Sequence, residues 1–469
     1  MNSTLRALNR FGLGARVGER RRIDDPRGWL RGQLKGDPPM IAAPAEGAAA
    51  AISDAVRSFR MAAQGDRQAR QQARRQLVAI AAAESRASIT ARATTERPFV
   101  ERLLAFWSNH FCVSVGAKVL VAPLAGSYER DAIRPHVLGR FEDMVLASAK
   151  HPAMLVYLDN FQSIGPTSRG AAGGGRGRGQ RGLNENYARE LLELHTLGVD
   201  GGYSQLDVQD LAKILTGWTV GGLARNRAAQ SMRPRARMQS PGSSQDPDGP
   251  IGFMFQASLH EPGAKTVLGT RYAAGGVEEG ERAIRSLCRH PSTARFIATK
   301  LVVHFVSDDP PPAAVDRVAR TFRDSDGDLR AVSAALIDLP DAWDERSRKF
   351  RTPQDWLVAV LRAFNASEAS EGVMPLLRQL RHPLWSPQAP KGFGDKTQEW
   401  ADPDSLLNRA ELARTVTRRL RAQPVDPRLL LDVVDITAGD PLNGFLGDSS
   451  IAAADRIALA LAGPAFQWR

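Results

Sequence analysis

The densest group of polar side chains in the sequence is Asn186, Glu190 and Glu193, with Arg189 beside them. At this spacing the amide and both carboxylates fall on one face of a helix. Such a set could ligate a divalent metal or act in acid–base chemistry. The structural alternative is that the glutamates pair with Arg189 or a distant arginine, while Asn186 hydrogen-bonds a loop. The di-iron pattern of helical bundles is not met, because it needs a histidine three residues after a glutamate.

Two histidines could complete such a site from other elements. His110 follows Trp107 and Asn109 at the end of an apolar helix, where the alternative is a hydrogen-bonded core histidine. His260, with Lys265 nearby, lies in a region that we expect to be more exposed, and its alternative role is a hydrogen bond that closes a loop. The catalytic candidates are Glu190, Glu193, His110 and His260, and the binding candidates are Asn184, Asn186, Arg189, Trp107, Asn109, Trp218 and Lys265. A divalent metal is the cofactor that this set suggests, and no metal ligand is assigned within it.

The absence of several catalytic motifs from the sequence argues against the enzyme classes that they define. There is no G-x-S-x-G elbow, no G-x-x-x-x-G-K-[ST] phosphate loop and no H-E-x-x-H pair, which disfavours the corresponding hydrolases, nucleotidases and zincins. The other histidines have contexts typical of surface or packing positions: His136, His151, His290, His304 and His382.

Composition places the chain among globular proteins. It has 469 residues, of which 43% are hydrophobic and 24% charged, so a mainly disordered chain and a fibre are excluded. Cys112 and Cys288 are far apart, which argues against a disulfide framework or a cysteine zinc site. No run of eighteen apolar residues and no export signal is present, so we expect no transmembrane segment and, on the sequence as given, a cytoplasmic protein.

The formal net charge of +12 gathers in three segments. Residues 165–182 have four arginines and no acid, residues 222–250 have five arginines and two acids, and residues 54–77 have six arginines and two acids. The run RGAAGGGRGRGQRG in the first segment resembles Arg–Gly sequences that bind RNA. It is short and has no aromatic residue, so nucleic-acid binding is a disfavoured alternative.

Hydrophobic periodicity predicts a mainly α fold. Helices are expected early in the chain near Arg20–Leu34, over Ala48–Ala83 and over Pro98–Phe111, the last as a buried core helix. Later helices are expected at about Val277–Arg289, Thr293–Val306, Ala313–Asp324, Leu329–Leu339, Gln354–Asn365, Ser405–Arg421 and Ile451–Leu461. Residues 383–404 are expected to form an ordered loop, because their aromatic side chains need burial.

The sequence pattern of Asn184–Trp218 predicts a helical hairpin. Asn184 is placed as an N-cap, Gly198 as a helix stop, and Ser204 with Asp207 as a capping box for the second helix. Phe253–Phe255 and Thr266–Leu268 are the strand candidates, and we expect them to pair as a small hairpin. The expected parts are an N-terminal helical part (1–164), a flexible Arg–Gly loop (165–182), the helical hairpin (183–221), a flexible insertion (222–250), and a β-hairpin with C-terminal helices (251–469), together one continuous domain.

Several blocks of sequence resemble the bacterial domain-of-unknown-function 1800 family. They are LNRFGLG at 8–14, FWSNHF at 106–111, YLDN at 157–160, NENYARELLELHTLGV at 184–199, YSQLDVQDLAKILTGW at 203–218, HEPGAKTVLG from His260, HPSTARFIATKL from His290, PKGF from Pro390 and the closing AFQWR. The order of the blocks is that of the family and covers nearly the whole chain. One departure is Phe393, where the family tends to have tryptophan.

What the resemblance implies about function is limited, because no activity is established for the family. Its members often carry an export signal and are often encoded beside a second, sulfatase-like protein, which implies a partner and a periplasmic or secreted location. This sequence departs in lacking the signal. The residues favour a binding or accessory protein with a structural polar core. The alternatives are a metal- or carboxylate-dependent, hydrolase-like enzyme around the Asn186, Glu190 and Glu193 helix, and nucleic-acid binding through the Arg-rich loops.

Overall fold

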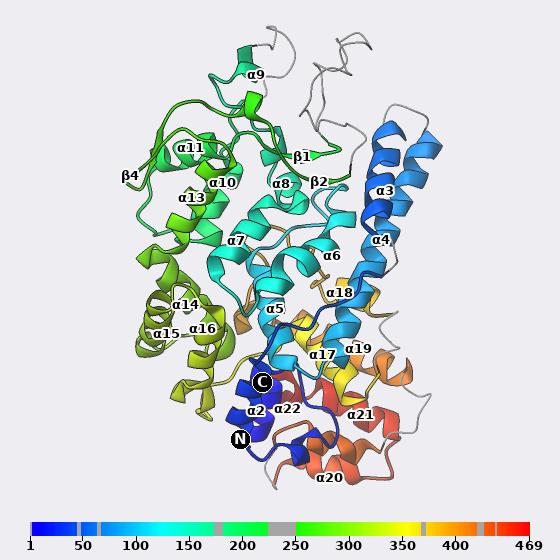
Figure 1. Cartoon of the computed structure of the whole chain (residues 1–469). Coiled ribbons are helices and arrows are strands. Elements are labelled where there is room, and N and C mark those ends of the chain that lie inside the picture. The colour runs from blue at the N-terminus through cyan, green and yellow to red at the C-terminus, as the bar shows by residue number, and fades with distance from the viewer. Residues whose placement is uncertain are drawn as a thin grey trace.

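Helices dominate the architecture (Figure 1). The computed structural model describes residues 2–44, 48–62, 67–172, 182–223, 250–366, 372–419, 426–436 and 439–469. Strands within these ranges form two antiparallel sheets of two strands each. The mainly α fold expected from the sequence is confirmed. In the same ranges, no helix combines the length and the apolar character needed to cross a membrane.

The N-terminal part differs from expectation in its longest helix. Instead of one helix over Ala48–Ala83 there are two, α3 (Ala48–Ala62) and α4 (Arg67–Thr94), which pack side by side (Figure 1). Each helix buries apolar side chains, such as Val56 in α3 and Leu77 in α4. Packing the two helices together covers apolar faces that one long helix would leave in water. The other elements here are α1 (Ser3–Arg6), η1 (Ala7–Phe11), η2 (Glu19–Arg22) and α2 (Pro26–Gln33).

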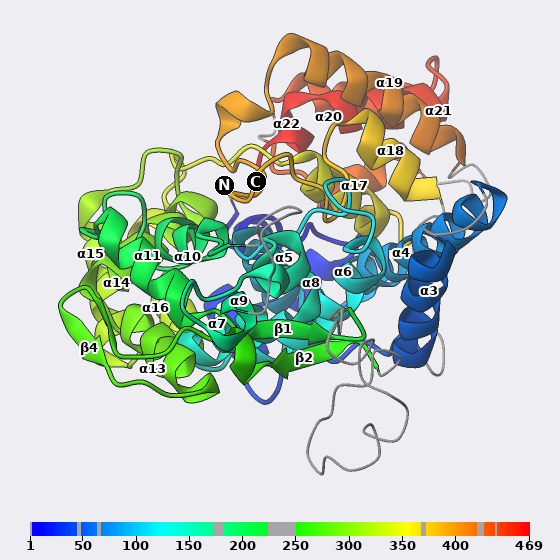
Figure 2. The same cartoon turned by 90° about the horizontal axis from the view of Figure 1, so that it is seen from above.

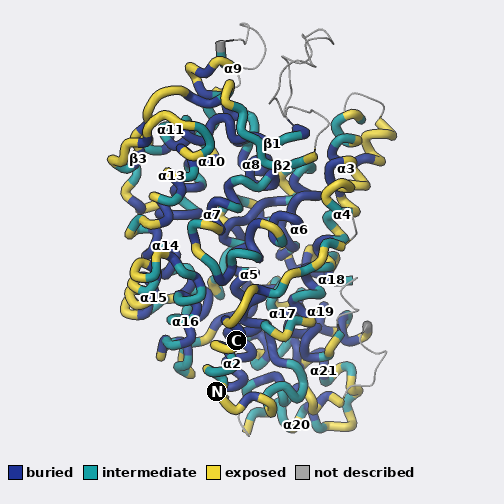
Figure 3. Tube along the Cα trace, viewed as in Figure 1, coloured by how far each residue is buried: buried dark blue, intermediate teal, exposed yellow. Residues whose placement is uncertain are grey.

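Helix α5 (Pro98–His110) is the buried helix near the middle of the molecule, and its expected bounds and burial are confirmed. Proline occupies its first turn, where the missing N–H is not needed. Phe99, Leu103 and Trp107 are each no more than 1% exposed. Figure 3 shows the buried chain around α5 and the exposed turns on the outer helices α3 and α15 (Pro312–Asp324).

A region without a predicted element lies between α5 and the helical hairpin. It folds into short helices: η3 (Ala122–Leu124), α6 (Ala125–Ser127), η4 (Tyr128–Ile133), η5 (Arg134–His136), α7 (Phe141–Lys150), α8 (Pro152–Tyr157), η6 (Asn160–Gln162) and α9 (Arg169–Ala172). Their shortness explains why no helical period stands out in this part of the sequence.

The hairpin itself consists of α10 (Asn186–Glu190), the π-helical η7 (Leu191–His195) and α11 (Gln205–Ile214). The capping box of Ser204 and Asp207 is confirmed. Asn184 accepts a hydrogen bond from Asn186 N over 2.9 Å, and Glu185 rather than Asn184 is the residue before the helix.

The strands are close to those expected, but they pair differently. β2 (Gly252–Phe255) pairs with β1 (Trp218–Gly221), with Trp218 opposite Phe255. β3 (Lys265–Val267) forms a tight hairpin with β4 (Thr270–Tyr272). The hairpin expected between Phe253–Phe255 and Thr266–Leu268 is therefore wrong, because each strand finds an antiparallel partner that sequence alternation alone does not specify.

The seven later helices expected from the sequence are found within a few residues, and the described C-terminal part has three further short helices, 373–379, 441–447 and 464–467, that were not predicted. They are α13 (Val277–Cys288), α14 (Pro291–Phe305), α15, α16 (Leu329–Ile337), α17 (Pro353–Ala363), α18 (Val373–Gln379), α19 (Pro403–Arg419), α20 (Pro441–Gly447), α21 (Ala453–Ala462) and α22 (Pro464–Gln467). Short 3₁₀ turns lie among them at η9 (Ala257–Leu259), η10 (Pro340–Trp343), η12 (Thr397–Glu399) and η14 (Pro427–Asp432). Seen from above, α19–α22 form a group apart from α13–α16 (Figure 2).

The two ends of the described chain meet (Figures 1 and 2). Arg10 is fully buried and donates to Val306 O over 2.8 Å and to Arg469 O over 3.0 Å, and Phe350 forms a β-bridge with Trp468. Burial lowers the pKa of Arg10 to about 9. The first and last family blocks of the sequence thus share one core. Most of the two Arg-rich insertions, 173–181 and 224–249, lies outside the described residues, so the expected flexible loops are not tested there.

Candidate functional site

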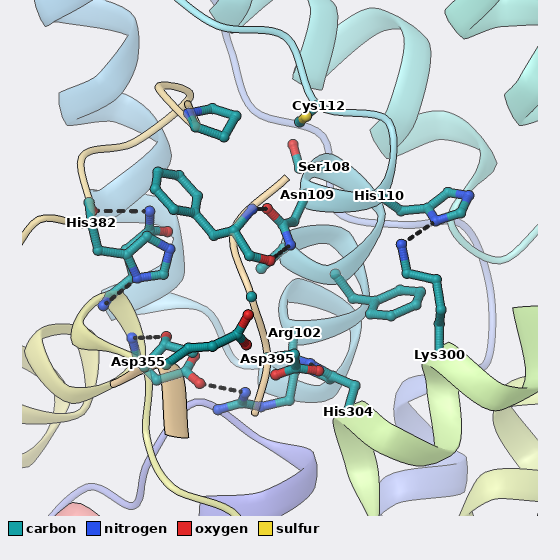
Figure 4. A pocket seen from close by; sticks show the side chains of 18 of the residues that line it. Arg102, Ser108, Asn109, His110, Cys112, Lys300, His304, Asp355, His382 and Asp395 are labelled. Carbon is teal, nitrogen blue, oxygen red and sulfur yellow. Dashed lines mark hydrogen bonds and ion pairs between the residues drawn. The ribbon is translucent and has the colours of Figure 1, made fainter. Parts of the chain in front are cut away.

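A cavity of about 330 Å³ lies where α5, α14 and the start of α17 meet residues 382–399, the loop that follows α18 (Figure 4). Its lining is rich in ionisable side chains: Arg92, Arg102, His110, Cys112, Lys300, His304, Asp355, His382, Lys391, Asp395, Lys396 and Glu399. Six separate segments of the chain supply the walls, so the site exists only in the folded protein.

His304 and Asp395 form a hydrogen-bonded pair in this cavity. His304 Nδ1 lies 2.8 Å from Asp395 Oδ2. Burial acts to raise the pKa of Asp395, but His304 and Lys349 outweigh it and hold the pKa at about 2. Because the ionised carboxylate can only accept, Nδ1 carries the proton and Nε2 carries the lone pair. No partner for Nε2 exists among the described residues.

The charge state of His304 follows from its surroundings. The residue is 9% exposed, and the ring of Phe106 lies 5.3 Å from its own. Burial lowers the pKa of His304, although Asp395 favours the charged form. His304 is therefore a neutral imidazole near pH 7, with one nitrogen fixed by a carboxylate and the other buried without a partner among the described residues.

Lys300 lies one helical turn before His304 on α14 and also lines the cavity. Its Nζ is 2.9 Å from His110 Nδ1, and His110 Nε2 is 3.1 Å from His195 O. Since a carbonyl can only accept, Nε2 of His110 is the protonated nitrogen and Nδ1 accepts from the lysine. Burial lowers the pKa of Lys300 to about 8 and lowers the pKa of His110 well below its ordinary value.

The loop that carries Asp395 is anchored to α5. Asn109 Nδ2 donates to Phe393 O over 2.9 Å, and Asn109 Oδ1 accepts from Phe393 N over 2.8 Å. Gly392 has φ of +80°, and a Cβ at this position would lie 2.5 Å from Asn109 O. The FWSNHF and PKGF blocks of the sequence therefore form one structural unit that places Asp395 beside His304.

Asp355 forms another wall, opposite arginine side chains. Arg102 Nη1 lies 3.1 Å from Asp355 Oδ2, and Arg469 Nε lies 3.5 Å from the same oxygen. Burial opposes ionisation of Asp355, but the two arginines outweigh it and keep its pKa far below the ordinary value. Asp355 and Arg102 are therefore both ionised, and their opposite charges offset each other.

Glu129 of η4 supports the cavity from behind. Its carboxylate accepts from Arg92 Nη2 over 3.0 Å, from Ser108 Oγ over 2.7 Å and from Trp385 Nε1 over 2.9 Å. Burial acts against ionisation, yet Arg92 and the hydroxyl donors lower the pKa of Glu129. This buried anion fixes Trp385 of the expected ordered loop, whose order is confirmed.

Of the residues predicted from the sequence, His110 and Asn109 line the cavity. Trp107 lies beneath them in the core, 1% exposed, with its ring 5.4 Å from that of His110. Glu190, Glu193 and His260 are not part of the lining.

The face of Asn186, Glu190 and Glu193 shows the pairing of Glu193 with Arg189 that the structural alternative includes. Arg189 Nη1 lies 3.5 Å from Glu193 Oε1, and Asn186 is exposed. Burial and the charge of Glu193 raise the pKa of Glu190, against the effect of Arg189. Asn184 Nδ2 donates to Leu158 O over 3.2 Å. These residues stay predictions as functional groups.

His260 and Lys265 belong to a different buried cluster. His260 is 8% exposed, so its expected exposure is wrong, because Phe255 of β2, Glu279 of α13 and Thr216 pack against it. His260 Nδ1 lies 2.8 Å from Thr216 O and Nε2 lies 3.1 Å from Glu279 Oε2. Lys265 Nζ lies 3.2 Å from Glu279 Oε1. Trp218, fully buried on β1, is a core residue beside this cluster.

No group of three or more histidine, cysteine, aspartate or glutamate side chains within the described ranges could hold a metal ion. The divalent metal suggested by the sequence therefore stays a prediction without a described ligand set.

Lys300, His304 and Asp395 are the site residues that sequence reasoning missed. Lys300 and His304 are four residues apart on a predicted helix, which puts them on one face, and this spacing was a usable signal. Asp395 gave none, because it is 91 residues away from His304 and lies in a loop.

Fold and site together define a mainly helical protein with a cavity lined by ionisable side chains. A family model described as "Protein of unknown function (DUF1800)" matches residues 6–468. The chain therefore belongs to this family, as its sequence blocks predicted. Comparison with curated proteins and comparison with solved structures each gave no match.

Proposed function

We propose that the cavity is the active site of an enzyme that performs general-base chemistry on a small polar molecule, with His304 as the base. The observation that carries this proposal is the His304–Asp395 pair, in which Nδ1 is fixed by the carboxylate and Nε2 has no described partner. A neutral imidazole of this kind can take a proton from a substrate or from water. Asp395 would stabilise the imidazolium that forms.

Comparison with two other buried histidines supports a chemical role. His110 and His260 each have both ring nitrogens within hydrogen-bond distance of protein atoms. A histidine that serves only packing is expected to be satisfied in this way. His304 differs from these two histidines, because its Nδ1 is held by a carboxylate and its Nε2 has no partner among the described residues.

The cavity does not favour a serine or cysteine nucleophile. The Ser108 hydroxyl donates to Glu129, so its proton is already committed to a buried carboxylate. Burial raises the pKa of Cys112 to about 12, which keeps it a thiol near neutral pH. The base therefore acts on substrate or water rather than on a protein nucleophile.

The test is turnover in a mixture of polar metabolites. Wild-type protein and the variants H304Q and D395N would be incubated with a protein-free bacterial extract, and consumption of compounds followed by mass spectrometry. H136Q is the matched control, since His136 is half-buried on η5 and is not part of the cavity lining. We expect conversion by wild type and H136Q and its loss in H304Q.

Equal conversion by H304Q and wild type would overturn the proposal, and so would the lack of any conversion by folded wild-type protein. In the second case a binding role for the same cavity becomes the better explanation. For a converted compound, the rate should rise with pH through the pKa of His304, below the ordinary histidine value, and then level off.

A further inference from the structure

Lys300 is placed as a reactive group rather than as part of an ion pair. It lines the cavity on the same face of α14 as His304, one turn away. Its Nζ contacts His110 Nδ1 at 2.9 Å and lies 5.5 Å from the centre of the Phe296 ring. In the part of the chain that the structure describes, Lys300 forms no ion pair with a carboxylate. Lys300 is half-buried, and an ammonium removed from water without an anionic partner is costly, which lowers the pKa of the side chain.

The groups around Lys300 keep the lone pair of that amine available. The described titratable neighbours are His110 on α5, His195 on η7, Cys112 after α5 and Asp395 in the loop. His110 accepts from Nζ through its unprotonated Nδ1, because its Nε2–H is directed to His195 O. A neutral Lys300 therefore donates one N–H to His110 and keeps its lone pair for an electrophile. Burial lowers the pKa of Lys300 to about 8, so the amine is present near neutral pH.

We propose that Lys300 forms an imine with the carbonyl group of an aldehyde or ketone substrate bound in the cavity. This inference rests on the proposed function and names its substrate class. His304 lies one helical turn from Lys300 on the same face of α14 and lines the same cavity, so it is the base that we assign to a proton on the carbon adjacent to the carbonyl carbon. When the imine nitrogen takes up a proton, the resulting iminium increases the acidity of the proton on that adjacent carbon, which gives the general base a chemical task.

The covalent step balances without a further reactant. The Nζ lone pair attacks the carbonyl carbon, a C–N bond forms, and the carbonyl π electrons move to oxygen. A proton passes from nitrogen to that oxygen to give a carbinolamine. Loss of water, with formation of the C=N bond, yields the imine. Addition of water reverses the sequence and regenerates the amine and the carbonyl compound.

The experiment is reductive trapping with acetaldehyde as the probe. Full-length protein at pH 7 would be treated with acetaldehyde and cyanoborohydride, which converts an imine into a stable ethylamine. Peptide mass spectrometry then gives the rate of ethylation at each of the nine lysines of the chain. We expect Lys300 to react at least tenfold faster than the exposed Lys35 and Lys391.

Two variants serve as controls. K300R keeps a cation at the position but removes the nucleophile, so rapid labelling should vanish while the other lysines label as before. K35R changes an exposed lysine outside the cavity lining and should leave labelling of Lys300 unchanged. Ethylation of Lys300 at or below the rate of the exposed lysines in the folded protein would overturn the imine proposal.

The trapping experiment tests the imine at Lys300, and the turnover experiment tests the general base His304, so either proposal can fail without the other. H304Q should still be trapped at Lys300 and yet lose conversion of the natural substrate. If wild type converts a compound in a His304-dependent way but Lys300 is not trapped, the general base stands and the imine is rejected. If Lys300 is trapped rapidly and H304Q converts substrate like wild type, the imine stands and the role of His304 is rejected.

Discussion

The Asn109 side chain pairs with the backbone of Phe393 through two hydrogen bonds, 2.9 Å from Nδ2 to Phe393 O and 2.8 Å from Phe393 N to Oδ1. The two residues are 284 positions apart, so this contact joins the core helix α5 to a distant loop. Asp395 lies two residues beyond Phe393 and contacts His304. Asn109 is therefore a positioning residue for the proposed base.

Replacing Asn109 by alanine should loosen this loop. The change removes two hydrogen bonds to partly buried backbone groups, for which we expect a loss of about 1–3 kcal/mol in the free energy of unfolding. Turnover that depends on His304 should fall as well. Urea denaturation measures the first effect. N186A is the control, because Asn186 is exposed and should tolerate alanine within about 0.5 kcal/mol. A stable N109A protein with full turnover would show that the loop holds its position without this pair.

Substitution of Gly392 tests the same contact between Asn109 and the loop, through the backbone conformation of the loop. Alanine there has to adopt φ of +80° and brings a Cβ to within 2.5 Å of Asn109 O, so something has to move. Gly36 also has positive φ, at +68°, but a Cβ there meets nothing within 4 Å. G36A should therefore lose only about 1 kcal/mol, whereas G392A should lose more and also lose turnover. Similar losses for both variants would mean that the contact with Asn109 is unimportant.

The protonation of His304 can be measured directly. We expect Nδ1 to carry the proton in wild type, because its partner is the ionised Asp395. In D395N the charge that favours the imidazolium is gone, so the pKa of His304 should fall further. Nitrogen chemical shifts of labelled histidine across a pH titration report both quantities. An Nε2-protonated ring in wild type would contradict the proposed role of His304.

Much of the helical architecture was predictable, because long amphipathic helices repeat their pattern over several turns. Helices such as Pro98–His110 and Pro312–Asp324 were found within a few residues. The division of the expected helix into Ala48–Ala62 and Arg67–Thr94 was missed, since alanine- and arginine-rich sequence is typical of both. Strand partners were missed for another reason: β1 and β2 pair across a long insertion, which local alternation cannot indicate.

The site was predictable only in part. His110 and Asn109 were singled out because polar residues end an otherwise apolar helix. The conspicuous face of Asn186 and Glu193 is outside the cavity lining, because the partners of a helical face are set by tertiary packing. His304 looked ordinary in sequence, and what distinguishes it is a carboxylate 91 residues away.

The buried pair of Asp355 and Arg102 should matter strongly for stability. D355N leaves Arg102 buried without a counter-charge, so we expect a loss of about 3–5 kcal/mol at pH 7, measured by urea denaturation. The pKa of Asp355 is depressed in the folded protein. Its contribution is therefore complete above the unfolded carboxyl pKa of about 4 and is lost as the pH falls below that value.

The matched control for this pair is Asp316, which pairs with Arg295 at 2.8 Å while 55% exposed. D316N should change the free energy of unfolding by less than about 1 kcal/mol, because solvent screens the exposed pair. Equal effects of D316N and D355N would show that burial is not what gives the inner pair its importance.

Buried neutral histidines should make the fold sensitive to mild acid. Burial lowers the pKa of His151, His195 and His382 to about 3 in each case. The unfolded chain binds protons at these residues below about pH 6.5 while the folded chain does not, so stability should fall as the pH drops below that value. The expected slope is about 1.4 kcal/mol per pH unit for each histidine, measured by urea denaturation between pH 7 and 5.

One of these histidines can be replaced without losing its structural contact. His151 caps α8 by accepting from Ala153 N over 3.1 Å, and asparagine can provide the same acceptor. H151N should therefore stay folded at pH 7 and show a shallower decline in acid, by about 1.4 kcal/mol per pH unit. An unchanged slope would mean that His151 takes up a proton in the folded protein as readily as in the unfolded chain.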